Sequence, residues 1–129
     1  MSFVYAVAFS GKKFVMVRHR RRAWEMPGGS IESDENPEEA IDREFLEETG
    51  MHFKPIGHIP LGDGIVFFGV AKGWPRRISN EVAEVSLFDI LPDRLSFPRE
   101  EYIAVLQEAR KVVKNYIKGD SIGDFAPQH

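Results

Sequence analysis

The stretch GGSIESDENPEEAIDREFLEETGM, residues 28–51, contains nine of the 20 acidic residues in a chain of 129 residues. The net charge of the whole chain is only −3, so the negative charge is concentrated in this one stretch. Carboxylates that lie this close together repel one another, and their repulsion opposes folding unless a positive group is near. The stretch therefore indicates a positively charged partner.

Local signals define a helix within the stretch. Asn36 suits the N-cap, Pro37 suits the first helical position, and Glu39 suits the third position of a capping box. Gly50 is a suitable residue to end the helix, because glycine readily adopts the left-handed conformation found there. The sequence predicts a helix over residues 37–49.

Three acidic residues stand late in this helix at positions i, i+3 and i+4: Glu44, Glu47 and Glu48. These spacings place their side chains on one face, where each like-charge pair costs about 0.2–0.5 kcal/mol. The helix dipole also disfavours anions near the C-terminus. A solvated face is the ordinary explanation of a glutamate-rich helix. Here Ile41 and Phe45 lie beside the stripe, so the stripe borders the buried side, and this position favours a bound cation.

The segment before the helix, PGGSIESDE, is expected to be a loop. Its Gly28 and Gly29 allow the backbone to approach a ligand closely. The chain has no cysteine, and His19, His52 and His58 lack ligand spacing to one another, so we expect these histidines to be structural or exposed. Carboxylate and carbonyl oxygens without Cys or His suit Mg²⁺ or Mn²⁺ better than zinc.

The rest of the chain predicts a mixed sheet with one further helix. Alternating apolar residues, separated by glycine-containing turns, predict a hairpin and three more strands, at residues 3–10, 13–19, 53–61, 65–73 and 82–90. Pro55 and Pro60 weaken the third of these. Apolar residues at helical spacing predict an amphipathic helix from about residue 99 to 118.

Composition limits the class of protein. With 43% hydrophobic residues, the chain is long enough for one sizeable core and too short for two, so we expect one domain over residues 1–118 and a flexible tail over 119–129. The lack of cysteine excludes disulfides, thiolate catalysis and cysteine-based zinc sites. There is no run of apolar residues long enough to span a bilayer, and we expect a cytoplasmic protein.

The glycines and charged residues of the stretch resemble the Nudix box, which spans Gly29 to Met51 here. The matching positions are Gly29, Glu35, Arg43, Glu44, Glu47, Glu48 and Gly50, with large apolar residues at Phe45 and Met51. The resemblance implies an α/β/α sandwich around a mixed sheet. It also implies metal-dependent hydrolysis of a nucleoside diphosphate linked to another group.

The resemblance also implies roles for individual residues. Glu44, Glu47 and Glu48 would bind Mg²⁺ or Mn²⁺, with the Gly28 carbonyl completing the shell. Glu44 is also a candidate general base, and Glu47 acts with it in catalysis. Arg43 and Glu35 would hold the loop and the helix together.

Other candidates lie outside the box. A later glutamate often contributes in this family, and Glu81 and Glu84 are the candidates, although a surface strand charge explains either one equally well. Arg18 and Arg20 could bind phosphates in bidentate fashion. Substrate contacts are also expected from Gly29 and, at the start of the last helix, from Glu100 and Glu101.

The substrate is less well defined. A MutT-type nucleoside triphosphate pyrophosphohydrolase is the leading interpretation, because the segment HRRRAWEMPGG is similar to that of members that sanitise the nucleotide pool. An oxidised nucleotide is one option, although residues 97–101 offer only glutamates where such members often have Asn or Asp. Markers typical of ADP-ribose and dinucleoside polyphosphate enzymes are missing from residues 65–69. ADP-ribose or another nucleoside diphosphate sugar stays an alternative.

A non-catalytic module that binds a nucleotide is another alternative. Such modules usually lose carboxylates of the box, and this chain keeps them. We expect a small-molecule nucleotide as the partner, with no nucleic-acid polymer and no membrane, and the sequence leaves a monomer and a homodimer open.

Overall fold

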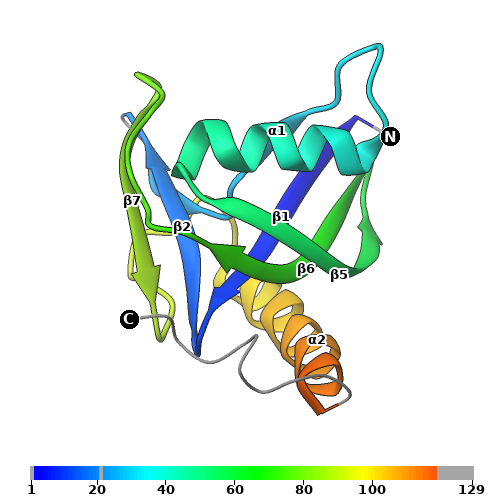
Figure 1. Cartoon of the computed structure of the whole chain (residues 1–129). Coiled ribbons are helices and arrows are strands. Elements are labelled where there is room, and N and C mark those ends of the chain that lie inside the picture. The colour runs from blue at the N-terminus through cyan, green and yellow to red at the C-terminus, as the bar shows by residue number, and fades with distance from the viewer. Residues whose placement is uncertain (1, 21, 119–129) are drawn as a thin grey trace.

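The computed structural model describes residues 2–20 and 22–118, so the predicted flexible tail, residues 119–129, lies outside the described residues. These residues form one sheet and two helices (Figure 1). The elements are β1 Phe3–Ser10, β2 Lys13–His19, β3 Trp24–Glu25, β4 Gly28–Ser30, α1 Pro37–Thr49, β5 His52–Leu61, β6 Gly64–Lys72, β7 Val82–Phe88 and α2 Arg99–Lys118.

Helix α1 has the ends that its sequence predicts. The Asn36 side chain accepts a hydrogen bond from the Glu39 N–H at 2.8 Å, and the Glu39 carboxylate accepts one from the Asn36 N–H at 2.9 Å. At the other end Gly50 has φ of 73° and donates its N–H to the Leu46 carbonyl. Both ends are therefore fixed by local contacts.

The sheet is mixed, as predicted. Strands run in the order β3-β2-β1-β6-β5, with β4 paired to β1 and β7 paired to β2. The β1–β6 pair is parallel, and the other pairs are antiparallel. Strand β5 pairs only with β6 among the described elements, and such an edge position tolerates Pro55 and Pro60.

Strands β1 and β2 pair only near their turn and then separate. Their register is limited to Phe9 with Phe14 and Ser10 with Lys13. Residues 24–30, which we call the inserted strip, fill the gap: β3 pairs with β2, and β4 pairs with β1. The prediction of a loop here is wrong for residues 28–30, because these residues form backbone pairs with β1. The strip brings Gly28 and Glu25 between the two halves of the sheet.

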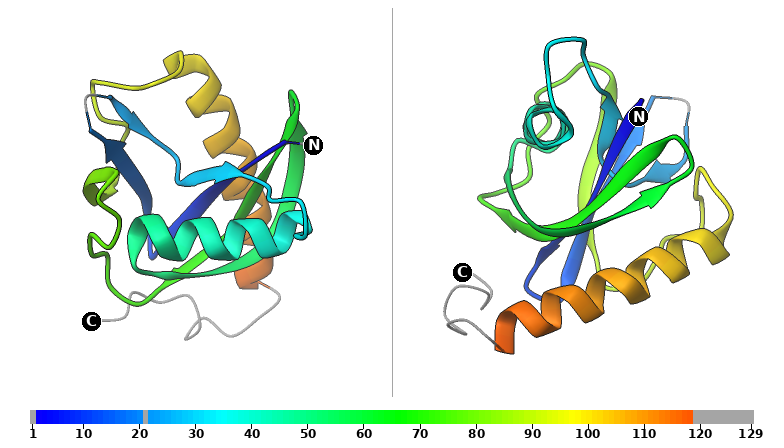
Figure 2. Two further views of the ribbon diagram at one scale, coloured as in Figure 1. Left: turned by 90° about the horizontal axis from the view of Figure 1, so that it is seen from above. Right: turned by 90° about the vertical axis from the view of Figure 1, so that its right-hand side faces the viewer.

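The two helices cover opposite faces of the sheet, as the views in Figure 2 show. Side chains alternate along β1, so Val4 and Ala6 belong to the core cluster under α1, whereas Val7 and Phe9 belong to the cluster under α2. The fold is thus an α/β/α sandwich, which confirms the predicted fold class. Neither helix of the described ranges has the length and apolarity needed to cross a lipid bilayer.

Candidate active site

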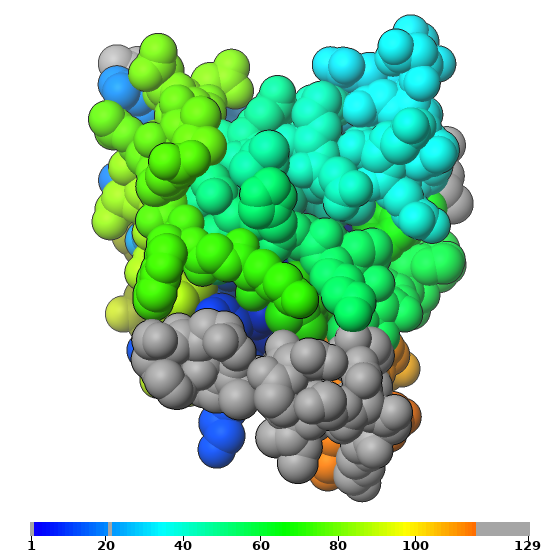
Figure 3. All heavy atoms as spheres, viewed as in Figure 1, coloured from blue at the N-terminus to red at the C-terminus, as the bar shows by residue number. Residues whose placement is uncertain are grey.

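The glutamate stripe of α1 runs from solvent into the protein. The exposed fraction of the side chain falls from 55% for Glu47 to 17% for Glu44 and 9% for Glu48. Figure 3 shows the face that carries α1, with the segments before the helix (cyan) and after β6 (light green) on either side of it. The stripe therefore leads from an open face to a buried carboxylate.

Glu48 is held by two groups from the sheet. One carboxylate oxygen accepts the Gly28 N–H at 2.9 Å, and the other lies 3.0 Å from Nε2 of His19. Burial raises the pKa of Glu48 to about 8, although the Gly28 N–H acts in the opposite direction. The protein thus disfavours the charged form of this side chain in the absence of a cation.

Neighbouring carboxylates raise the pKa of Glu48 further. After burial and the opposing Gly28 hydrogen bond, the charges of Glu44, Glu25 and Glu81 act on it, in that order. These residues come from α1, β3 and the segment before β7, so elements far apart in the sequence bring negative charge to one place. We refer to Glu25, Glu44, Glu48 and Glu81 as the carboxylate cluster.

His19 and Glu25 are site residues that sequence reasoning missed. Nε2 of His19 lies 3.4 Å from Oε1 of Glu25 and also contacts Glu48. Spacing along the chain could not show this, because the three residues lie on β2, β3 and α1. The pairing of β2 with β3, which sets Val17 opposite Glu25, was the signal that could have found the contact.

Arg43 joins the segment before α1 to the stripe. Its Nε and Nη2 donate to the two oxygens of Glu35 at 2.8 and 2.7 Å, and Nη2 also donates to the Ser30 carbonyl. Nη1 donates to Glu44 at 2.7 Å and to Glu47 at 3.1 Å. The bidentate bond lowers the pKa of Glu35 to about 2. The guanidinium therefore orients one carboxylate of the cluster while it fixes the preceding segment.

The two glycines of β4 are needed for different reasons. A Cβ on Gly28 would lie 2.1 Å from the Val4 carbonyl oxygen, which belongs to the paired strand. A Cβ on Gly29 would lie 2.4 Å from the end of the Glu44 side chain. The first glycine thus permits strand pairing, and the second permits Glu44 to lie against the backbone.

Glu81 and Glu84 interact with different groups. The charge of Glu81 acts on Glu48, whereas Oε1 of Glu84 accepts a hydrogen bond from Nε of Arg18 at 2.7 Å. Arg18 and Glu84 are register partners on β2 and β7. Arg20 donates its Nε to the Asn80 carbonyl at 2.8 Å. Both arginines are therefore anchored through Nε, Arg18 to a side chain of β7 and Arg20 to the segment before β7.

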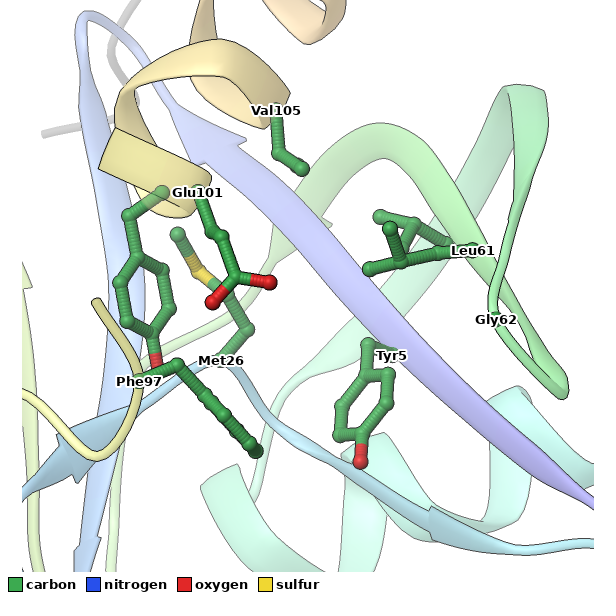
Figure 4. A pocket seen from close by; sticks show the side chains of 9 residues that line it. Tyr5, Met26, Leu61, Gly62, Phe97, Glu101 and Val105 are labelled. Atoms are coloured by element: carbon green, nitrogen blue, oxygen red, sulfur yellow. The ribbon is translucent and has the colours of Figure 1, made fainter. Parts of the chain in front are cut away.

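A cavity of about 290 Å³ opens on the other side of the inserted strip (Figure 4). Most of its lining is apolar or aromatic, and Glu101 supplies its one charged side chain; the lining residues are Tyr5, Met26, Leu61, Gly62, Val66, Phe97, Glu101, Tyr102 and Val105. Glu100 is exposed and does not line the cavity. Met26, which lines the cavity, follows Glu25 directly, so the inserted strip borders both the cavity and the carboxylate cluster.

Comparison with known proteins identifies the family of the chain. The family model described as NUDIX domain matches residues 2–111. The chain belongs to the NUDIX domain family.

Proteins that are similar to this NUDIX domain are named after different substrates. It is 38% identical over 56 residues to the "Putative 8-oxo-dGTP diphosphatase YtkD" of Bacillus subtilis, a match that covers 43% of this chain and 35% of that one. It is 36% identical over 66 residues to an RNA pyrophosphohydrolase of Xanthomonas campestris, covering 51% of this chain and 28% of that one. The chain thus spans about a third of the length of the relatives that it matches.

Solved structures are similar over most of the chain. The Bacillus subtilis pyrophosphohydrolase BsRppH superposes with a TM-score of 0.68 at 25% identity, and the match covers 89% of this chain and 82% of that one.

The residues of this NUDIX domain fit a divalent cation. Within residues 2–20 and 22–118, no three His, Asp or Glu side chains are arranged as a ready metal-binding group, because Arg43, the Gly28 N–H and His19 hold the carboxylates instead. The buried Glu48 nevertheless lies in an excess of negative charge. Its surroundings offer the hard oxygen donors that Mg²⁺ and Mn²⁺ prefer.

Proposed function

We propose that this NUDIX domain is a metal-dependent pyrophosphohydrolase. The leading candidate substrate is a nucleoside triphosphate, which the domain would convert to the nucleoside monophosphate and pyrophosphate. The supporting observation is that a cation-demanding carboxylate cluster and a mostly apolar cavity of about 290 Å³ meet at one strip of the sheet. A mostly apolar pocket with few polar groups is typical of small-molecule sites, and the neighbouring carboxylates suit a metal that binds phosphates.

In this proposal the stripe on α1 holds the ion. Glu47, Glu48 and the Gly28 carbonyl are the ligands, with Glu81 as the further carboxylate. When bound, a divalent ion offsets the charge of the phosphoryl oxygens and makes a water molecule a better nucleophile. Glu47 and Glu48 stand on the C-terminal half of α1, the Gly28 N–H donates to Glu48, and the charge of Glu81 acts on Glu48.

Glu44 is the proposed general base. Burial raises its pKa, while the hydrogen bond from Arg43 opposes that rise. A carboxylate with a raised pKa accepts a proton more readily near neutral pH than an exposed one does. Arg43 keeps the acceptor oxygen in place, and Glu35 in turn fixes the guanidinium. Glu35 and Arg43 therefore act through position.

The cavity is proposed to take the base and the sugar. Tyr5, Phe97 and Tyr102 offer aromatic surfaces, and Glu101 offers an acceptor that prefers N–H groups on the edge of a base. The backbone N–H of Arg20 donates to the Glu81 carbonyl at 3.1 Å, and Arg18 lies two residues earlier, on β2. The remaining N–H groups of both arginines are proposed to bind the outer phosphates. In this arrangement the cavity binds the base, which differs between nucleotides, and the arginines bind the phosphates, which all nucleotides share.

Turnover tests the proposal. We expect the domain to release pyrophosphate from at least one compound among nucleoside triphosphates and oxidised nucleotides, with Mg²⁺ required and excess EDTA abolishing the reaction. ADP-ribose, dinucleoside polyphosphates and 5′-triphosphorylated RNA belong in the same screen, measured by chromatography of products. Full activity in excess EDTA would refute the metal assignment. Binding without turnover in the complete screen would favour a non-catalytic module.

The order of kcat/KM among nucleotides tests whether the cavity binds the base and the arginines bind the phosphates. Arg20→Ala should lower kcat/KM for every nucleotide by a similar factor, because phosphates are shared. Glu101→Ala should change the ranking among GTP, oxidised dGTP and ATP, because the carboxylate meets the base. Glu100→Ala is the matched control, one residue away and outside the cavity, and should leave the ranking unchanged. A uniform loss in Glu101→Ala would show that the cavity does not hold the base.

A further inference from the structure

Tyr5 lies where the cavity meets the carboxylate cluster. On β1 its register partners are Gly28 on one side and Val66 on the other. Its ring rests against Gly28, since a Cβ on that glycine would lie 2.9 Å from Cδ1 of Tyr5. The same ring lines the cavity. One side chain therefore touches both the cavity and the backbone that holds Glu48.

The Tyr5 hydroxyl is directed away from Glu101 in the cavity wall, as Figure 4 shows. A tyrosine hydroxyl carries a proton that it can donate in a hydrogen bond.

The position of Tyr5 fits a contact with the first phosphate of a nucleotide. If the nucleoside fills the cavity and the outer phosphates lie with the cation at the stripe, the first phosphate must pass Tyr5. A phosphate oxygen is a charged acceptor, and a hydrogen bond to a charged group contributes more than one between neutral groups.

We propose that Tyr5 is a substrate-positioning residue whose ring forms a wall for the nucleoside and whose hydroxyl donates a hydrogen bond to the first phosphate. This inference rests on the proposed function and assigns a residue outside the box of charged residues. It predicts that the hydroxyl distinguishes a nucleotide from the corresponding nucleoside.

Two ligand pairs and two variants test the inference. Dissociation constants for GMP and guanosine, and for AMP and adenosine, are measured with Mg²⁺ by NMR titration on wild type, Tyr5→Phe and Tyr5→Leu. In Tyr5→Phe we expect the preference for the monophosphate over the nucleoside to fall about 10- to 100-fold, with nucleoside affinity unchanged. In Tyr5→Leu we expect nucleoside affinity to fall as well. Thermal melting verifies that each variant is folded.

The outcomes separate the inference from the proposed function. An unchanged preference in folded Tyr5→Phe overturns the role of the hydroxyl. Equal weakening of monophosphate and nucleoside overturns it too, because the hydroxyl would then serve the sugar or base. A wild-type domain that hydrolyses no nucleotide in the screen overturns the proposed function, whereas normal wild-type turnover that Tyr5→Phe matches in kcat and KM overturns only the inference about Tyr5.

Discussion

The surroundings of Glu48 disfavour the negative charge of its carboxylate. Its side chain is 9% exposed, and three other carboxylates act on it. Removing a carboxylate from water disfavours its ionised form, and like charges add to that effect. A proton or a cation at this position therefore stabilises the folded protein.

Replacing Glu48 with Gln should separate stability from activity. The pKa of Glu48 is about 8 in the folded protein against an ordinary value of 4.5. Its contribution to stability is therefore complete below about pH 4.5 and is lost as the pH rises through about 8. In metal-free buffer we expect the free energy of unfolding of the wild type to decline over this range more steeply than that of Glu48→Gln, as measured by urea unfolding.

The same variant should lose hydrolysis by orders of magnitude at saturating Mg²⁺, because a ligand charge is missing. Glu100→Ala is the control for unspecific effects of removing a surface charge. Equal pH dependence of unfolding in wild type and Glu48→Gln would show that Glu48 does not titrate as described.

The sequence predicts the acidic residues of the candidate site more readily than the residues that contact them. Glu44, Glu47 and Glu48 share one helix face, so local spacing places them together. The contacts of His19 and Tyr5 depend on strand register and on the separation of β1 from β2, which no local pattern encodes. Site residues that meet across the sheet therefore required the structure.

At the scale of elements, strand β4 pairs with β1 and also lies against Glu44, the candidate general base. Gly28 pairs with Tyr5 and donates its N–H to Glu48, while Gly29 lies under Glu44. A short strand of three residues thus contacts both β1 and α1. Substitutions at its two glycines should have different effects.

Gly28→Ala and Gly29→Ala form a matched pair. The new Cβ at residue 28 would meet the Val4 backbone, which cannot move without disturbing the sheet, so we expect a clear loss of thermal stability. At residue 29 the three atoms nearest to it would belong to the end of the Glu44 side chain, which can move more easily than backbone. We therefore expect Gly29→Ala to melt close to wild type and to lose about 10- to 100-fold in activity, by displacing that carboxylate. The reverse pattern would contradict this division.

Long elements were predictable because their signals are local. The capping box and Gly50 define α1, and apolar periodicity defines α2 and the longer strands. Strands β3 and β4 have two and three residues and form because β1 and β2 separate to receive them. Their existence is a tertiary effect, which explains why residues 28–30 were expected to be a loop.

At the scale of the whole molecule, the site links two sides of the sandwich. Helix α1 provides the stripe on one face of the sheet, and α2 provides Glu101 and Tyr102 on the cavity side. A cation bound to the stripe, as proposed, would stabilise the folded chain, because the unfolded chain does not assemble these carboxylates. Metal binding should therefore be visible in global unfolding.

Mg²⁺ should raise the melting temperature. At about 100 times the dissociation constant the stabilisation is about 2.7 kcal/mol, which corresponds to an increase of about 10 °C for a domain of this size. Differential scanning calorimetry with Mg²⁺ and with EDTA measures the shift, and Glu48→Gln should show a much smaller one. The same shift in wild type and variant would mean that the ion binds elsewhere.

The inserted strip has a practical consequence for laboratory evolution. The strip serves both parts of the candidate site: Glu25 belongs to the carboxylate cluster, Gly28 donates to Glu48, and Met26 lines the cavity. Libraries that randomise the strip would disturb turnover whenever they alter base preference. Libraries confined to Leu61 and to the start of α2 would vary the cavity while the ion-binding half stays intact, so new substrate preferences should be recovered there at the least cost in rate.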